Sequence, residues 1–208
     1  MIRLYDYYRS SAAYRVRIAL NLKGLEYEQV TISLIDGAQK SEEYRAINPS
    51  GFVPALEVDG HLMTQSLSII NYLNAAYPEP PFAPTDLIAA AHVRSMAQIV
   101  ASDIHPVNNL RILKYLKTDL GVEEDAKNTW YAHWITEGFT GLEALAKQHG
   151  GEYLSGDVPG LADICLVPQI YNARRFDVSL DAFPVLVGYD AKASALEAFV
   201  KAHPDNNQ

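Results

Sequence analysis

The sequence predicts two domains, an α/β domain followed by an all-helical one. Strand and helix signals alternate over roughly the first eighty residues. The segment PEPPFAPTD, residues 78–86, then holds four prolines in nine residues and has the composition of a linker. Only helical patterns follow it. We therefore expect a first domain over residues 1–80, a linker over residues 81–86 and a helical domain over residues 87–208.

The first domain is expected to be a mixed sheet with helices on its faces. An apolar stripe at helical spacing predicts the first helix, and Gly24 ends it. Asp59-Gly60 suits the two-residue type I′ turn of a hairpin. The predicted strands are residues 2–7, residues 27–32 and a hairpin over residues 54–63; the predicted helices are residues 12–23, a short one in SEEYRAIN, and residues 66–77.

The second domain shows no strand signal, and its helical patterns are separated by short turns. The predicted helices are residues 87–117, 123–149, 161–173 and about 185–202.

Composition restricts the partners and the compartment. The formal net charge of −8 and a sequence pI of about 5.2 argue against a nucleic-acid or anionic-membrane surface. A single cysteine, Cys165, excludes an intrachain disulfide and suits a reducing compartment. The start MIRLYDYY lacks the apolar region of a signal peptide. We expect a cytoplasmic protein with no membrane span and no metal site.

Two adjacent hydroxyls precede the first predicted helix. Ser10 and Ser11 lie between a strand and a helix start, where unpaired backbone N–H groups and the helix dipole favour an anion or a thiolate. Serine is also a preferred N-cap residue, so a purely structural role fits as well. No G-x-S-x-G motif surrounds the pair, which argues against a hydrolase nucleophile.

Two further signals lie beside predicted strands. Val53-Pro54 precedes a strand, where the proline is either ordinary edge chemistry or a cis bond that lets the preceding backbone pair with an extended ligand. Gln65-Ser66 lies between a strand and a helix start and would suit a carboxylate, with Ser66 as the expected N-cap.

The order of these signals resembles the cytosolic glutathione transferases, which have a thioredoxin-like N-terminal domain and an all-α C-terminal domain. RSSAAYRVRIAL is similar to the zeta-class motif R-S-S-C-x-W-R-V-R-I-A-L, whose best-known members are maleylacetoacetate isomerases. DIHPVNNLRILKYL, LADICLVPQIYNARRFDVSL and FPVL extend the resemblance over essentially the whole chain. Ala12 departs from the motif, because the family has cysteine there.

The resemblance implies glutathione as cofactor and a role for each matching residue. Ser10, assisted by Ser11, would hold the glutathione thiol as a thiolate, and the Val53 backbone, before a cis Pro54, would pair with the cysteinyl part. The γ-glutamyl end would be bound by Gln65 and Ser66, the glycyl end by Gln39, and the thiol would be closed over by His105 and Asn109. The implied reaction is addition of the thiolate to the cis double bond of maleylacetoacetate, rotation, and elimination to fumarylacetoacetate.

Arginines in this acidic chain suggest where a dicarboxylate binds. Arginine suits bidentate carboxylate recognition, although on a helix it is more often solvated or ion-paired. We predict that Arg9, Arg111 and Arg175 bind the substrate carboxylates. Arg174 is expected to be a surface neighbour, because adjacent helical positions point in different directions.

The start of the helix predicted at residue 161 carries a motif with a structural role. Members of the family that this chain resembles usually have Thr or Ser three residues before the aspartate of LAD. This chain has Gly160 before Asp163, which is a weaker cap. Cys165 is expected to be a buried thiol without a catalytic role.

Other functions remain open from the sequence. Maleylpyruvate isomerase shares the diacid chemistry, and a general glutathione transferase or peroxidase shares the thiol site. A non-enzymatic binding protein on this fold is disfavoured by retention of Ser10, Pro54, Gln65 and Ser66. By analogy with the family we expect a homodimer.

Overall fold

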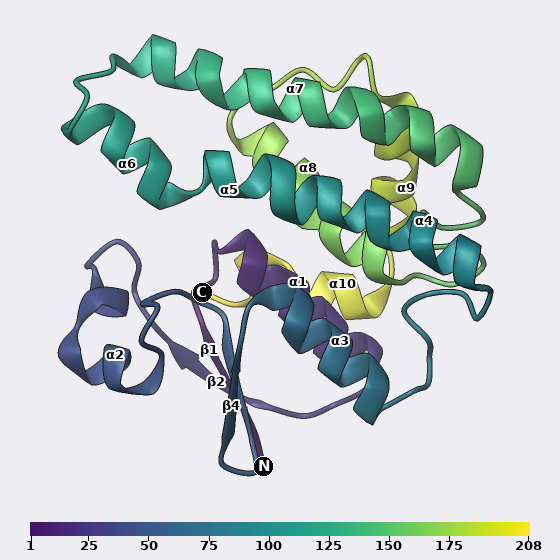
Figure 1. Cartoon of the computed structure of the whole chain (residues 1–208), viewed down its shortest axis with the longest axis horizontal. Coiled ribbons are helices and arrows are strands. Elements are labelled where there is room, and N and C mark those ends of the chain that lie inside the picture. The colour runs from purple at the N-terminus through teal and green to yellow at the C-terminus, as the bar shows by residue number, and fades with distance from the viewer. The chain divides into compact units, whose positions relative to one another are not determined.

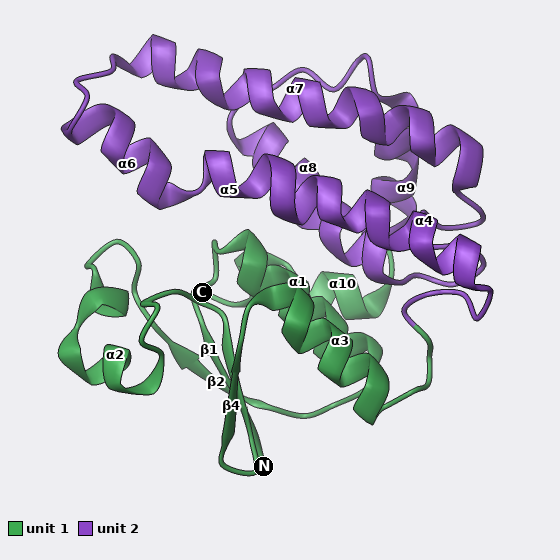
Figure 2. Ribbon diagram, viewed as in Figure 1, with its two compact units in different colours: residues 1–81, 195–208 green, residues 82–194 purple.

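The computed structural model describes residues 1–208, and residue contacts divide the chain into two compact units (Figure 1, Figure 2). Unit 1 comprises Met1–Pro81 and Ala195–Gln208, and unit 2 comprises Phe82–Ser194. The contacts thus group residues 195–208 with the first unit, whereas the sequence assigns them to the second domain. The boundary at residues 81–86 stays a prediction.

Unit 1 contains the expected mixture of strands and helices. Its elements are β1 (Ile2–Asp6), α1 (Ser11–Leu22), β2 (Glu28–Thr31), the 3-10 turn η1 (Ala38–Lys40), α2 (Glu42–Ile47), β3 (Ala55–Val58), β4 (His61–Thr64), α3 (Ser66–Ala76), α10 (Glu197–Ala202) and the 3-10 turn η3 (Pro204–Asn206).

The four strands form one mixed sheet in the order β2-β1-β3-β4. β1 and β2 are parallel, whereas β3 is antiparallel to both β1 and β4. Asp59 and Gly60 have φ values of 50° and 84°, so the predicted type I′ hairpin is confirmed. This sheet confirms the thioredoxin-like N-terminal domain.

Each face of the sheet is covered by helices of unit 1 (Figure 1). Side chains alternate along a strand, so Leu4 and Leu56, both 0% exposed and paired across β1 and β3, lie on one face. Tyr5 and Ala55 lie on the other face, in a cluster with Tyr44 of α2. The helices α1 and α3 pack against each other, and α10 packs against α1.

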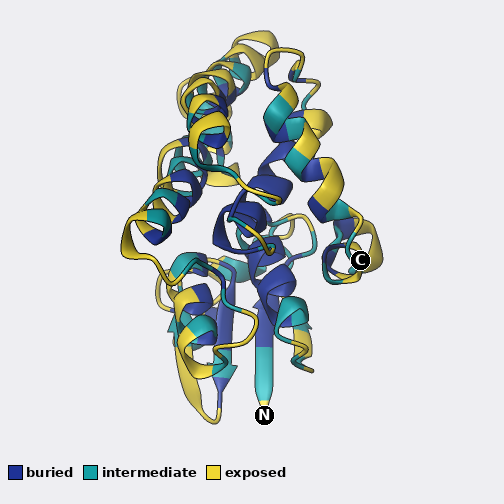
Figure 3. Ribbon diagram, turned by 90° about the vertical axis from the view of Figure 1, so that its right-hand side faces the viewer, coloured by how far each residue is buried: buried dark blue, intermediate teal, exposed yellow.

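Unit 2 is entirely helical, as predicted. Its elements are α4 (Leu87–Gln98), a π-helical segment η2 (Ile99–Ile104), α5 (His105–Asn108), α6 (Leu110–Thr118), α7 (Glu124–His149), α8 (Leu161–Arg175) and α9 (Pro184–Ser194). α8 is buried along most of its length and packs against α4 and α9. Buried residues line the interior of each unit, and exposed residues cover the outer faces of the helices (Figure 3). None of the helices combines the length and the apolar character needed to cross a membrane.

Two of the predicted helices are wrong in their extent. The helix predicted over residues 87–117 contains the π-helical segment and is interrupted at Asn109, whose ψ of 162° is extended and whose side chain caps α6. The helix predicted over residues 185–202 is two helices, because Leu196 has an extended ψ of 140°.

A buried hydrogen-bond network begins α8 without a cap side chain at Gly160. The carboxylate of Asp163 accepts from the backbone N–H groups of Leu154 (2.9 Å), Ser155 (3.0 Å) and Gly160 (3.0 Å). Ser155 Oγ accepts from the N–H groups of Ala162 (2.9 Å) and Asp163 (3.4 Å). Burial raises the pKa of Asp163, while the backbone donors act in the opposite direction. Ser155 therefore supplies the hydroxyl that a Ser or Thr at position 160 would supply.

The backbone explains why glycine stands at that position. A Cβ on Gly160 would lie 2.4 Å from the carbonyl oxygen of Phe82. This is closer than two non-bonded atoms approach, so a side chain is excluded and the hydroxyl has to come from elsewhere. Cys165, further along α8, is completely buried, which fits the predicted core position.

Candidate functional site

The first part of the site is the turn between β1 and α1. The N–H of Ser10 donates to the carbonyl of Tyr7 at 2.8 Å, and this turn places Ser10 at the N-cap of α1. The hydroxyl oxygen of Ser10 accepts from the N–H of Ala13 at 3.2 Å, so its N-cap role is confirmed. A hydroxyl has one donor hydrogen besides its two lone pairs. Capping therefore leaves the O–H of Ser10 able to donate to an anion.

The environment of Ser10 favours negative charge. No acidic residue lies in the first turn of α1, so nothing there neutralises the positive end of the helix. Ser10 is half-buried, whereas Ser11 is 6% exposed. Of the two predicted hydroxyls, Ser10 is the more accessible.

The second part is the segment that enters β3. The Val53–Pro54 peptide bond is cis, which selects one of the two alternatives that the sequence leaves open. Val53 is 9% exposed. The pairing of β3 with β1 and β4 begins only at Ala55, so the backbone of Val53 lies outside the ladder. Backbone groups outside the ladder remain able to pair with the backbone of a peptide-like ligand.

The third part is the start of α3, where one expectation is wrong. The N-cap residue is Gln65, not Ser66, and its side chain makes no capping hydrogen bond. Ser66 begins the helix, and its hydroxyl accepts from the guanidinium of Arg15 at 3.4 Å. Gln65 is exposed and has φ 68° and ψ 116°. Such a conformation costs about 1–3 kcal/mol in a residue other than glycine and is typical of functional sites.

The register of the sheet brings these three parts to one end. Tyr5 pairs with Ala55, and Ala55 pairs with Thr64, so the three residues form one row across the sheet. The chain leaves this row toward Ser10 on β1, comes into it from Val53 on β3, and leaves it toward Gln65 on β4. The predicted thiol, cysteinyl and γ-glutamyl positions of unit 1 therefore share one end of the sheet.

Gln39 is a further polar group of unit 1. It lies in η1, and its side-chain Oε1 is buried without a hydrogen-bond partner. An unpaired buried acceptor is costly, and a polar ligand could satisfy it.

The predicted residues of unit 2 lie on and after its π-helical segment. His105 begins α5 directly after η2, and it is half-buried. The side chain of Asn109 accepts from the N–H of Ile112 at 3.3 Å as the cap of α6. Arg111 is exposed on the first turn of α6.

Arg9 and Arg175 share an arrangement that suits anion binding. The guanidinium of Arg9 lies 5.0 Å from the ring centroid of Tyr8, and that of Arg175 lies 4.9 Å from the ring centroid of Phe176. Neither forms an ion pair with a carboxylate of the chain. An aromatic ring against one face of a guanidinium leaves its N–H edge available to a carboxylate.

The Phe176 ring is itself held in place. It stacks on Tyr131 of α7 with the centroids 3.9 Å apart and the planes 24° apart. Burial raises the pKa of the Tyr131 hydroxyl, and the nearby Arg175 acts in the opposite direction. Tyr131 and Phe176 therefore fix the surroundings of Arg175.

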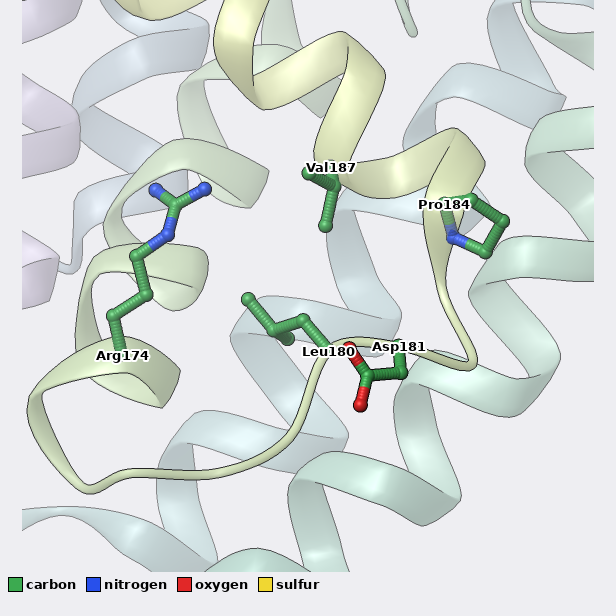
Figure 4. A pocket seen from close by; sticks show the side chains of 5 residues that line it. All are labelled: Arg174, Leu180, Asp181, Pro184 and Val187. Atoms are coloured by element: carbon green, nitrogen blue, oxygen red, sulfur yellow. The ribbon is translucent and has the colours of Figure 1, made fainter.

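Arg174 differs from its neighbour. Its guanidinium pairs with the carboxylate of Asp190 at 2.7 Å. It lines a hollow of about 360 Å³ together with Leu180, Asp181, Pro184 and Val187, which come from α9 and the loop before it (Figure 4). The arrangement is consistent with the expected surface role of Arg174.

Sequence reasoning missed the part that Arg15 and Phe176 play beside predicted site residues. Arg15 is 1% exposed and reaches Ser66 from α1. A signal was available, since Arg15 is a charged residue among the apolar residues of a predicted helix. Phe176 follows the helix that carries Arg175, and nothing in its spacing distinguishes it from a core residue.

Several known proteins are similar to this chain. Residues 4–81 match the family model described as glutathione S-transferase, N-terminal domain. A probable maleylacetoacetate isomerase of Vibrio cholerae is 49% identical over 98% of this chain and 95% of its own length.

Two solved structures are also closely similar. The holo structure of a maleylpyruvate isomerase, described as a bacterial zeta-class glutathione S-transferase, has a TM-score of 0.96 at 42% identity and covers 98% of this chain and 97% of its own. A maleylacetoacetate isomerase of Methylobacterium extorquens, with malonate and glutathione bound, has a TM-score of 0.94 at 36% identity over 98% and 97% of the two chains. The chain therefore belongs to the glutathione S-transferase family and, within it, to the zeta-class group that includes the maleylacetoacetate and maleylpyruvate isomerases.

Proposed function

We propose that this chain is a glutathione-dependent cis–trans isomerase that converts maleylacetoacetate to fumarylacetoacetate. The observation that carries the proposal is the shared sheet end of Ser10, Val53 and Gln65, in a chain 49% identical to a probable maleylacetoacetate isomerase. The donor hydrogen of Ser10 and the backbone of Val53 fit a cysteinyl tripeptide. Malonate and glutathione bound to the Methylobacterium relative support the same pairing of a dicarboxylate with a thiol.

We assign each part of glutathione to the residues predicted for it. Ser10, assisted by Ser11, holds the sulfur, and Val53 before Pro54 pairs with the cysteinyl backbone. The remaining assignments are Gln65 and Ser66 for the γ-glutamyl end, Gln39 for the glycyl end, and His105 and Asn109 beside the thiol. Bound glutathione would supply a thiolate that adds to the cis double bond and leaves after rotation about the resulting single bond.

The N-terminus of α1 keeps the glutathione sulfur ionised. A hydrogen bond donated to the anion lowers a thiol pKa, and so does the positive end of a helix. The Ser10 hydroxyl and the uncompensated start of α1 supply both effects.

The arginines orient the substrate. We propose that Arg9, Arg111 and Arg175 bind the carboxylates of the dianion and stabilise charge that develops beside the reacting carbons. The absence of an ion pair at Arg9 and at Arg175 supports this role. Exchange of Arg111 or Arg175 for alanine is expected to raise the KM for substrate about tenfold, since a charge-assisted hydrogen bond is lost. Arg174→Ala is the matched control, and an unchanged KM in the first two variants would contradict the assignment.

Maleylpyruvate is the alternative substrate. It is favoured by the TM-score of 0.96 to a maleylpyruvate isomerase. Both substrates are diacids with the same cis double bond, so the same residues would serve either reaction.

A single assay tests the function. Isomerisation of maleylacetoacetate and of maleylpyruvate is followed with and without glutathione. We expect turnover only with glutathione and a higher kcat/KM for maleylacetoacetate. Turnover without glutathione would disprove the mechanism, and a higher kcat/KM for maleylpyruvate would reverse the choice of substrate.

We further propose that the chain works as a homodimer in the cytoplasm. Two-fold dimers are the commonest oligomers of soluble proteins, and a single buried cysteine suits a reducing compartment. Sedimentation at several concentrations would reveal a monomer if the first part is wrong.

A further inference from the structure

A completely buried arginine in α1 joins three segments of unit 1. Arg17 is 0% exposed, and its guanidinium donates to both carboxylate oxygens of Asp6 at 2.7 and 2.9 Å. It also donates to the carbonyl of Tyr8 at 2.9 Å and to the carbonyl of Ala202 at 3.0 Å. These acceptors belong to the end of β1, to the turn before α1 and to the last residue of α10.

Burying the ion pair of Arg17 with Asp6 inside unit 1 has a large desolvation cost. Both side chains are 0% exposed, and removing two charges from water costs several kcal/mol per ion before their attraction offsets it. Apolar residues of similar volume often stabilise a fold equally well or better. Apolar residues, however, cannot donate hydrogen bonds, whereas the planar guanidinium donates to two backbone carbonyls at once.

One of these carbonyls belongs to the turn that carries Ser10. Tyr8 lies between Tyr7, whose carbonyl accepts from the N–H of Ser10 at 2.8 Å, and Arg9. The bond from Arg17 therefore fixes the middle of a turn that is fixed at its end by the Ser10 N–H. Both hydrogen bonds therefore constrain the backbone that leads into Ser10.

The other carbonyl belongs to α10, and further contacts hold that helix. The side chain of Asn21 on α1 donates to the carbonyl of Ala198 at 3.0 Å. Phe199 and Ala202 are buried, and α10 packs along α1 as Figure 1 shows. The helix thus supplies one of the acceptors of the buried Arg17 guanidinium and is itself anchored on α1.

We propose that α10 and Arg17 position the thiol site: α10 holds the guanidinium of Arg17, and the guanidinium holds the Tyr8 carbonyl and hence the Ser10 turn. Arg17 is a positioning residue, because it acts through the turn. The inference rests on the proposed function only in that Ser10 holds the glutathione thiol.

The test measures the pKa of the glutathione thiol bound to the full-length protein, by titrating the ultraviolet absorbance of the thiolate. Arg17→Lys keeps the charge beside Asp6 but cannot span both carbonyls. We expect it to raise the bound-thiol pKa and to lower kcat roughly tenfold, since charged hydrogen bonds to the turn are lost. Asn21→Ala loosens only α10 and is expected to act in the same direction, roughly threefold in kcat.

A matched control lies on the same helix. Glu197→Gln removes the exposed ion pair of Glu197 with Lys201, formed at 2.7 Å, and is expected to leave the thiol pKa unchanged. Thermal unfolding shows that each variant is folded. If Arg17→Lys does not fold, the thiol pKa measured with Asn21→Ala tests the inference, because this variant leaves the buried charges intact.

The outcomes separate this inference from the proposed function. An unchanged thiol pKa in the folded variants would overturn the inference. A wild-type protein that lowers the thiol pKa but isomerises neither diacid would overturn the proposed function, while the response of the thiol pKa to Asn21→Ala would still test the inference.

Discussion

The N-termini of α1 and α8 differ in how their free backbone N–H groups are satisfied. At α8 the cap is closed: the Asp163 carboxylate takes three backbone donors, the Ser155 hydroxyl takes two more, and both residues are buried. At α1 the cap is open: the half-buried Ser10 hydroxyl takes one donor and keeps its own hydrogen. A helix start that is satisfied internally stabilises the fold, whereas one that keeps a donor and a positive end can bind an anion.

The largest loss of stability is expected at the closed cap of α8. Asp163→Ala leaves three buried N–H groups without their acceptor, and we expect it to lower the free energy of unfolding by about 3–5 kcal/mol. Denaturant unfolding measures the change. The folded fraction should retain the wild-type affinity for glutathione, and a loss of affinity without a loss of stability would mean that the closed cap has a binding role.

A substitution at the open cap of α1 should lower the activity more than the stability. Ser10→Ala removes the donor to the thiolate, and we expect kcat to fall about a hundredfold, as for loss of one donor to a developing anion. The free energy of unfolding should fall by only about 1 kcal/mol, the usual cost of losing a serine cap. Ser11→Ala is the companion variant, and an equal loss of kcat there would show that the two hydroxyls share the role.

Ser155→Ala weakens the closed cap of α8 without removing its carboxylate. It removes the hydroxyl that accepts from Ala162 and Asp163, so the free energy of unfolding should fall by about 1–2 kcal/mol. Adding Gly160→Ser should not restore stability, since its Cβ would meet the Phe82 carbonyl. Recovery in that double variant would refute our account of Ser155.

The smallest effect is expected where the chain departs from the zeta-class motif. Ala12 stands at the family's cysteine position, directly after the two serines. Ala12→Cys should change kcat/KM by less than about twofold, because this thiol would add no donor comparable with the Ser10 hydroxyl. A large gain in isomerase rate would show that the reaction uses the cysteine.

The local signals in the sequence predicted the elements of unit 1 well. Alternation, the Asp59-Gly60 turn and the hydroxyl at Ser10 each act over a few residues, so the sheet and the cap of α1 followed from them. The cap of α3 was missed because Gln65 adopts a positive φ, which no rule of composition assigns to glutamine.

Features that local sequence patterns do not encode could not be predicted. The break at Asn109 and the π-helical segment before it interrupt a pattern that is helical on both sides. The role of Ser155 depends on the Phe82 carbonyl, which is distant in sequence. The roles of Gln39, His105 and Asn109 rest on the family resemblance and stay predictions.

The path of the chain through the two units has a consequence for synthesis. Unit 1 begins with the first residues but incorporates Ala195–Gln208, so unit 2 is an insertion within it. Domains commonly fold in the order in which they leave the ribosome. Here unit 2 can complete its interior before α10 is made, because Ala202, which accepts a hydrogen bond from the Arg17 guanidinium, is translated only after the whole of unit 2. A nascent chain halted before residue 195 would hold a finished helical unit beside an unfinished sheet unit.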